Sequence, residues 1–120
     1  MIRFKWSSSL LIVALLAAQD GVHRIYSDVY YNEEGGDLLG TELELTTHGR
    51  EVTGVLRIYQ GGCATPSAVR GTLLHGKLHL VGDHAPSGGG KFEVDGIIQG
   101  EGLLLEKARL KRINKAHCQN

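Results

Sequence analysis

The sequence predicts an all-β fold, an antiparallel up-and-down meander of about seven strands that forms a small barrel. Its 120 residues include seventeen glycines and only two prolines, and glycine recurs too often for long helices to form. Short segments alternate apolar and polar residues, which is the period of a half-buried strand. Three of them share the pattern Val-x-Gly-x-Leu/Ile, and an inward glycine lets a strand bend as a small barrel requires. A two-sheet β-sandwich is the alternative.

Turn-forming residues divide the chain into seven expected strands of about the usual length. In chain order these strands cover residues 22–31, 38–47, 50–60, 67–74, 77–82, 91–99 and 103–113. Three of the connections are short enough for the turn to predict the pairing register.

The first short turn is at residues 48–49, where the histidine would take the positive φ that this residue type tolerates better than most. A two-residue turn there pairs Leu43 with Gly54 and keeps apolar residues on one face. We therefore expect Gly54 to lie inside the barrel, opposite Leu43.

The second short turn is at residues 75–76 and also holds a His-Gly pair. It pairs Gly71 with Leu80 on the apolar face and Thr72 with His79 on the polar face. Gly71 is therefore expected inside the barrel, and His79 outside.

The third connection, residues 100–102, is interpreted as a three-residue loop whose last glycine is left-handed. This register places Asp95 opposite Lys107 and Glu93 opposite Arg109, and opposite charges favour such cross-strand pairs. A two-residue loop would instead bring two acidic residues face to face.

Residues 1–18 have the layout of a signal peptide, because Arg3 and Lys5 precede a short apolar run that ends in small residues. The run is shorter than the roughly 20 residues that cross a bilayer, which disfavours a membrane anchor. We expect one β-domain over residues 19–120, in a periplasmic or secreted protein. Outward charges such as Glu42 argue against stable membrane insertion after signal removal.

The charge balance argues against a nucleic-acid partner. The chain has 13 basic and 13 acidic residues, and loss of Arg3 and Lys5 leaves a formal charge of −2. Nucleic-acid binding would need a clustered basic face. The basic residues at 107–115 instead alternate with apolar ones, as on one face of a strand.

Cys63 and Cys118 are the two cysteines of the chain, and an exported protein meets an oxidising compartment. We expect them to form a disulfide. In the loop-entropy model such a bond stabilises the fold by about 4 kcal/mol.

The segment DVYYNEEGGDLLG at 28–40, followed by ELEL at 42–45, combines an aromatic first strand, an acidic Gly-Asp turn and a Leu-Leu-Gly start to the second strand. In these features residues 26–112 resemble small exported bacterial proteins of uncharacterised function, a resemblance that brings no known activity. The meander also resembles lipocalins and avidins in architecture. Trp6, the only tryptophan, lies in the expected signal peptide, so the Gly-x-Trp mark of lipocalins and the tryptophan-lined pocket of avidins are absent.

Tyr26, Tyr30 and Tyr31 are the candidates for a ligand site, because they would line the mouth of the barrel. A continuous cavity beside them would favour a small ligand, whereas a filled interior would favour a protein partner.

His79, Asp83 and His84 are the candidates for a metal site, since histidine and carboxylate are common zinc ligands. No helical or Cys-x-x-Cys spacing aims them at one point, so an exposed polar loop is the expected arrangement. No Gly-x-Ser-x-Gly motif is present, and we expect neither catalytic residues nor a cofactor.

These observations favour a non-catalytic binding module for a protein partner or a small ligand, with the loops at 60–66 and 82–90 projecting from the scaffold. The alternative is an envelope component that assembles through an exposed strand edge, because seven strands could leave the sheet open. A metal-dependent hydrolase is the third hypothesis.

Overall fold

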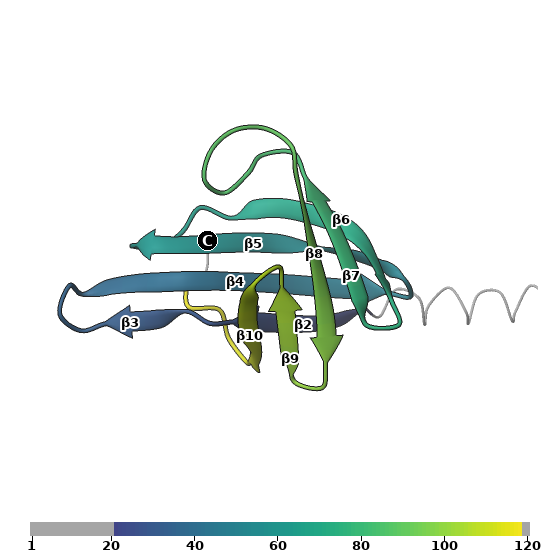
Figure 1. Cartoon of the computed structure of the whole chain (residues 1–120), viewed down its shortest axis with the longest axis horizontal. Helices are drawn as coiled ribbons and strands as arrows, with labels where there is room; N and C mark the ends of the chain where they lie inside the picture. The colour runs from purple at the N-terminus through teal and green to yellow at the C-terminus, as the bar shows by residue number, and fades with distance from the viewer. Residues whose placement is uncertain (1–20, 119–120) are drawn as a thin grey trace, which may run out of the picture.

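The computed structural model describes residues 21–118, which form an antiparallel β structure (Figure 1). The expected signal peptide at 1–18 lies outside these residues. Among the described residues no helix has the length and apolar character needed to span a membrane. The strands are β2 (Val22–Ser27), β3 (Tyr30–Asn32), β4 (Asp37–His48), β5 (Glu51–Gly61), β6 (Ser67–Leu74), β7 (Lys77–Gly82), β8 (Phe92–Gln99), β9 (Gly102–Leu105) and β10 (Ala108–Ile113).

Eight of these strands close into a barrel. Neighbours pair in the order β2-β10-β9-β8-β7-β6-β5-β4-β3, and a further pairing of β2 with β4 joins the two ends of the sheet. The ninth strand, β3, pairs with β4 beyond β2. The prediction of a small antiparallel barrel is confirmed, the sandwich alternative is wrong, and seven was too low a count because two expected strands are each divided.

Side chains from all eight strands pack in the barrel interior, where β8 contributes the partly buried Phe92, Val94 and Ile98. The buried core contains Tyr26, Leu43, Leu45, Val52, Leu56, Val69, Leu78, Leu80, Leu103, Leu105 and Leu110. Alternate residues of each strand supply this core, as the pleat of a sheet requires.

The inward glycines allow two strand pairs to approach closely. A Cβ on Gly71 would overlap the carbonyl oxygen of His79, and Gly71 pairs with Leu80 as predicted. A Cβ on Gly54 would likewise overlap the backbone of β4. Both positions are therefore restricted to glycine by the partner backbone rather than by a partner side chain.

The first register prediction is wrong by two residues. The turn is formed by residues 49–50, so Gly54 lies opposite Leu45 instead of Leu43. The positive φ belongs to Gly49, at 65°, and not to His48. The same face stays buried, because a slip of two residues preserves the alternation. In the second turn, His75 does have a positive φ, of 52°.

The third register prediction is also wrong. Gln99 pairs with Gly102 around a two-residue loop, and the left-handed glycine is Gly100, with φ 59°. Asp95 consequently lies opposite Glu106, whose backbone N–H donates to the Asp95 carbonyl at 2.9 Å. The predicted pairs with Lys107 and Arg109 do not form.

Two local features divide the outer expected strands. Glu106 has a positive φ of 53°, which turns the chain between β9 and β10 and brings β10 against β2. At the other divided strand, the Asp28 carboxylate accepts the backbone N–H of Thr41 at 2.7 Å. In the gap between β2 and β3, this side-chain acceptor takes the place of a ladder hydrogen bond to β4.

Candidate binding groove

Three neighbouring strands, β6 to β8, present a polar row on the outer face of the barrel, and the turn after β9 extends it. Their registers align Thr72 with His79 and His79 with Asp95. Glu106 continues the row, because its Oε2 accepts the backbone N–H of Asp95 at 2.7 Å. The like-charge contact that disfavoured this register in the sequence is offset by that hydrogen bond.

A second row, apolar except for Lys77, runs beside the polar one. Leu74 pairs with Lys77, Lys77 with Ile97, and Ile97 with Leu104. Leu74 and Ile97 are each 44 % exposed, although both are large aliphatic residues on the outer face. The two rows border an open groove of about 770 Å³, whose wall also includes His75.

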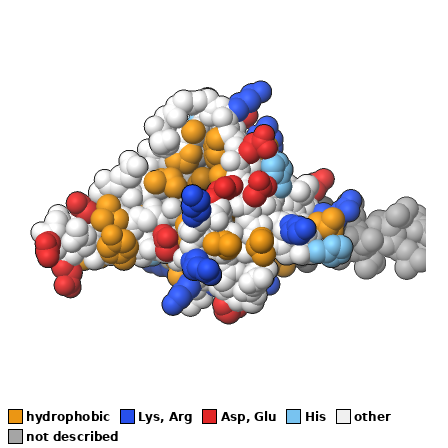
Figure 2. Space-filling model, viewed as in Figure 1, with side chains coloured by type: hydrophobic (Ala, Val, Ile, Leu, Met, Phe, Trp, Pro, Cys, Tyr) orange, Lys and Arg blue, Asp and Glu red, His pale blue; other side chains and the backbone are white. Residues whose placement is uncertain are grey.

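The polar row carries an imidazole held between two carboxylates. His79 Nδ1 lies 2.7 Å from Asp95 Oδ1, and His79 Nε2 lies 3.3 Å from Glu93 Oε1. The hydrogen bond with Asp95 raises the pKa of His79 above its ordinary value of 6.5, and the charges of both carboxylates add to the shift. Figure 2 shows acidic side chains gathered beside a histidine on the β7–β8 side of the molecule.

The three tyrosines predicted to line one ligand site are not brought together. Tyr26 is fully buried in the barrel core, whereas Tyr30 and Tyr31 are 59 % and 60 % exposed on β3. In Figure 2 hydrophobic side chains gather at this projecting end of the molecule. Tyr30 and Tyr31 lie on opposite faces because they are successive residues of one strand.

The three metal candidates are likewise separated by their partners. His79 is held by Asp95, while Asp83 faces Arg70 at 3.4 Å. His84 follows in the loop at 83–91, where the chain folds back with Ala85 N–H donating to Gly90 O at 2.9 Å. Over residues 21–118 no group of three or more histidine, cysteine, aspartate or glutamate side chains is arranged to hold a metal ion.

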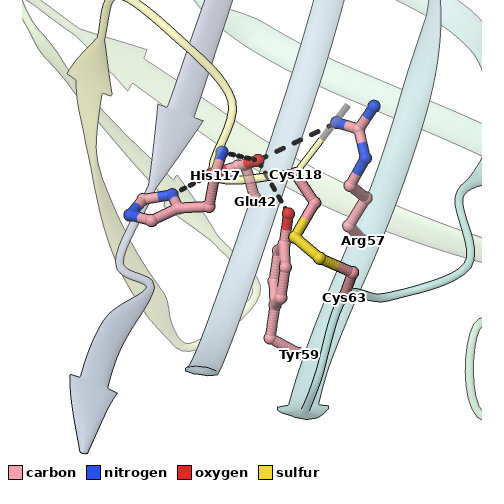
Figure 3. Close-up of a disulfide and its surroundings, with 6 residues drawn as sticks. All are labelled: Glu42, Arg57, Tyr59, Cys63, His117 and Cys118. Atoms are coloured by element: carbon pink, nitrogen blue, oxygen red, sulfur yellow. Dashed lines mark hydrogen bonds and ion pairs between the residues drawn. A yellow bond between two sulfur atoms is a disulfide. The ribbon is translucent and has the colours of Figure 1, made fainter. Parts of the chain in front are cut away.

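A second polar cluster, which the sequence did not predict, lies beneath the C-terminal segment (Figure 3). Glu42 has no exposed side-chain area, although it lies on the outer face of β4. Its carboxylate accepts the Tyr59 hydroxyl at 3.2 Å and the His117 backbone N–H at 3.2 Å, and it contacts His117 Nδ1 at 2.6 Å. Arg57 Nη1 lies 3.8 Å away.

The predicted disulfide fastens this cluster. Cys63 and Cys118 are bonded, which confirms the sequence prediction and holds the segment after β10 against β4 and β5. Cys118 packs with Tyr59 and Ala64 in a small apolar group of its own. We call Glu42, Arg57, Tyr59, His117 and the disulfide the C-terminal clasp.

Burial and charge shift two pKa values in and beside the clasp. Burial raises the pKa of Tyr59 above 10.0, and the negative charge of Glu42 adds to this. At Glu44 burial acts to raise the pKa, but hydrogen bonds from His23 and Arg57 outweigh it, so the pKa falls below 4.5. Arg57 donates to Glu44 at 3.0 Å and so links the clasp to the surface.

Comparisons with models of protein families, with curated proteins and with solved structures each found no match to this chain. The groove and the clasp are therefore interpreted from their own geometry. The available sequence signal for the groove was the outward position of Leu74 and Ile97, two large aliphatic residues on a face that the alternation assigns to solvent.

Proposed function

We propose that this protein is a non-catalytic binding domain whose partner is another protein, docked in the groove across β6 to β9. The observation that carries the proposal is the contrast between the interior and this face. In the interior Leu43 and Leu80 are fully buried and the cavity at one end of the barrel holds about 110 Å³, whereas the groove of about 770 Å³ is open and exposes aliphatic side chains. Concave sites with apolar walls and a few polar groups are typical binding sites.

The groove favours an extended peptide segment with an aliphatic side chain next to a basic one. The aliphatic side chain would pack against Leu74, Ile97 and Leu104. The basic one would face Asp95 and Glu106, because the carboxylates of this surface outnumber its lysine. Such charge complementarity increases specificity and the association rate more than the affinity.

A photocrosslinking experiment tests the proposal. A benzophenone amino acid is introduced at Ile97 or, as the matched control, at Tyr31, which is apolar and exposed on a different part of the surface. We expect one protein from the envelope fraction to crosslink from the Ile97 position. That product should weaken at high salt, since screening reduces attraction between exposed charges.

Substitutions make the test specific to the groove. Ile97→Ser should reduce binding of the captured protein by about fivefold or more, as expected for an apolar residue at the centre of an interface. Tyr31→Ser should leave it unchanged. Equal loss from both variants, or crosslinking from Tyr31 alone, would argue against docking in the groove.

A second candidate function is assembly through a strand edge. Within residues 21–118 β3 pairs on one side alone, with β4, and residues 57–61 of β5 pair with β4 but extend beyond β6. An unpaired edge is a template for another chain. A strand-edge dimer should dissociate when Tyr30→Lys is introduced. If the parent protein itself sediments as a monomer in analytical ultracentrifugation, this function is excluded.

The disulfide is compatible with an oxidising compartment outside the cytoplasm. We propose a periplasmic or secreted location on this basis together with the residues at 1–18. N-terminal sequencing of the protein recovered from the exported fraction tests the location, because uncleaved protein retained in the cell would contradict it.

A further inference from the structure

A small cavity opens at the end of the barrel where β2 begins. Its volume is about 110 Å³, and its wall is formed by Val22, Arg24, Tyr26, Leu45, Thr47, Leu73 and Ile98. None of these residues borders the groove described above. Val22 is 48 % exposed at the rim, whereas Tyr26 and Leu45 are buried in the core, so the cavity leads from solvent to the core.

Tyr26, whose hydroxyl is unpaired, forms part of the wall of this cavity. The residue is fully buried, and its hydroxyl has no hydrogen-bond partner among the described residues. A buried hydroxyl without a partner costs about 1–3 kcal/mol. A ligand that supplied an acceptor would recover this cost, and its acceptor atom would have to enter the cavity.

Arg24 brings a positive charge to the same cavity. It pairs with Leu45 as Tyr26 pairs with Leu43, and paired residues share a face of the sheet. Both leucines belong to the core, so Arg24 lies on the inward side of β2, at the exposed rim. No ion pair joins Arg24 to a carboxylate within residues 21–118.

We propose that this cavity, the barrel-mouth site, binds a short-chain monocarboxylate. The carboxylate would accept from Arg24, whose planar guanidinium matches two oxygens, and from the Tyr26 hydroxyl. The aliphatic part would contact Val22, Leu73 and Ile98. A neutral ligand would leave the arginine without a counter-charge, and a purely polar anion would leave the aliphatic wall unused.

The volume limits the length of the ligand. A water molecule occupies about 30 Å³ of liquid, so 110 Å³ holds roughly three or four groups of methylene size. Butyrate is therefore the probe of choice. For a ligand of so few atoms we expect a Kd on the order of 1 mM.

The test is an NMR titration of the purified protein, with its disulfide formed, against butyrate, butyramide and inorganic phosphate at constant ionic strength. Butyrate should shift the amide signals of Val22, Thr47 and Leu73 with one saturating isotherm. Butyramide and phosphate should each bind about tenfold more weakly, because one lacks the charge and the other lacks the aliphatic chain.

Three variants assign the contacts. Arg24→Gln should weaken butyrate binding about tenfold or more, and Arg109→Gln, an exposed arginine on β10, should not change it. Tyr26→Phe should weaken binding while leaving the urea midpoint of the free protein unchanged or higher, since its hydroxyl has no partner there.

Several results would overturn the barrel-mouth site. They are the absence of saturating shifts near the cavity, phosphate binding as tight as butyrate binding, or equal affinity in the Arg24→Gln and parent proteins. A lower urea midpoint with unchanged butyrate affinity in Tyr26→Phe would show that the hydroxyl serves the fold instead. Crosslinking at Ile97 does not depend on any of these results, so the two sites can fail separately.

Discussion

Two histidine–carboxylate pairs of almost equal length lie in opposite surroundings. His117 Nδ1 is 2.6 Å from Glu42, and His79 Nδ1 is 2.7 Å from Asp95. The side chain of Glu42 has no exposed area, whereas that of Asp95 is 72 % exposed. The distances alone would suggest two equivalent interactions.

Burial makes their roles different. A desolvated carboxylate depends on every donor around it, so Glu42 holds the C-terminal clasp together and would be costly to remove. An exposed pair is screened by water and salt and contributes little to stability. His79 and Asp95 are instead able to exchange protons and hydrogen-bond partners with solvent.

The largest expected effect comes from breaking the buried pair. Glu42→Ala leaves the Tyr59 hydroxyl and the His117 N–H without their shared acceptor and removes a buried charge beside Arg57, so it should lower the free energy of unfolding by about 3–5 kcal/mol. Glu93→Ala, which removes an exposed carboxylate beside His79, should change it by less than about 0.5 kcal/mol. Urea unfolding of both variants measures the difference, and equal costs would refute the comparison.

The disulfide offers the next test. Replacing both cysteines, by Cys63→Ser with Cys118→Ser, should cost about 2–4 kcal/mol and release the segment that covers Glu42. In that background Glu42→Ala should cost much less than in the parent, a coupling of about 0.5–3 kcal/mol in a double-mutant cycle. Additive costs would mean that the disulfide and Glu42 act independently.

The position of the exposed His79–Asp95 pair depends on how closely β6 approaches β7, because Gly71 lies against the carbonyl oxygen of His79. Gly71→Ala should force these strands apart and cost about 1–3 kcal/mol. Gly90→Ala is the matched control, since a Cβ there would meet nothing within 4 Å. A neutral Gly71→Ala in the same urea measurement would mean that the strands separate freely.

The smallest expected effect is a shift in the pKa of His79. The pKa of His79, followed by NMR, should lie above 6.5 and return toward 6.5 in Asp95→Asn, while Asp83→Asn should leave it unchanged. Because the folded pKa is raised, the stability from this pair is fully present below pH 6.5 and is lost as the pH rises through the folded value. A parent pKa at or below 6.5 would contradict the paired geometry.

Much of the barrel could be predicted from the sequence, because the alternation of apolar residues is a local signal. The turn at 75–76 and the inward Gly71 are correct for that reason. The prediction for the loop at 100–102 is wrong because a backbone hydrogen bond from Glu106 to Asp95 prevails over the pairing of opposite charges. The side-chain acceptor of Glu106, which offsets the acidic contact with Asp95, depends on a turn that no local pattern reveals.

The candidate sites were harder to predict than the fold. Glu42 alternates with core leucines, so the sequence placed it in solvent, and its burial depends on a segment 75 residues away along the chain. The grouping of Arg24 with Tyr26 depends on where β2 enters the barrel. Both arrangements are products of distant contacts, whereas the disulfide could be inferred because two cysteines allow one pairing.

The way the barrel closes also constrains when the domain can fold. β2, near the start of the chain, has β10 as one of its two partners, so closure brings together segments separated by nearly the whole domain. Contacts of such long sequence separation slow folding, because the loop entropy must be lost before the contacts form. Until β10 is available, the growing chain presents open sheet edges. Because Cys118 follows β10, its disulfide with Cys63 cannot form before the last strand has been made.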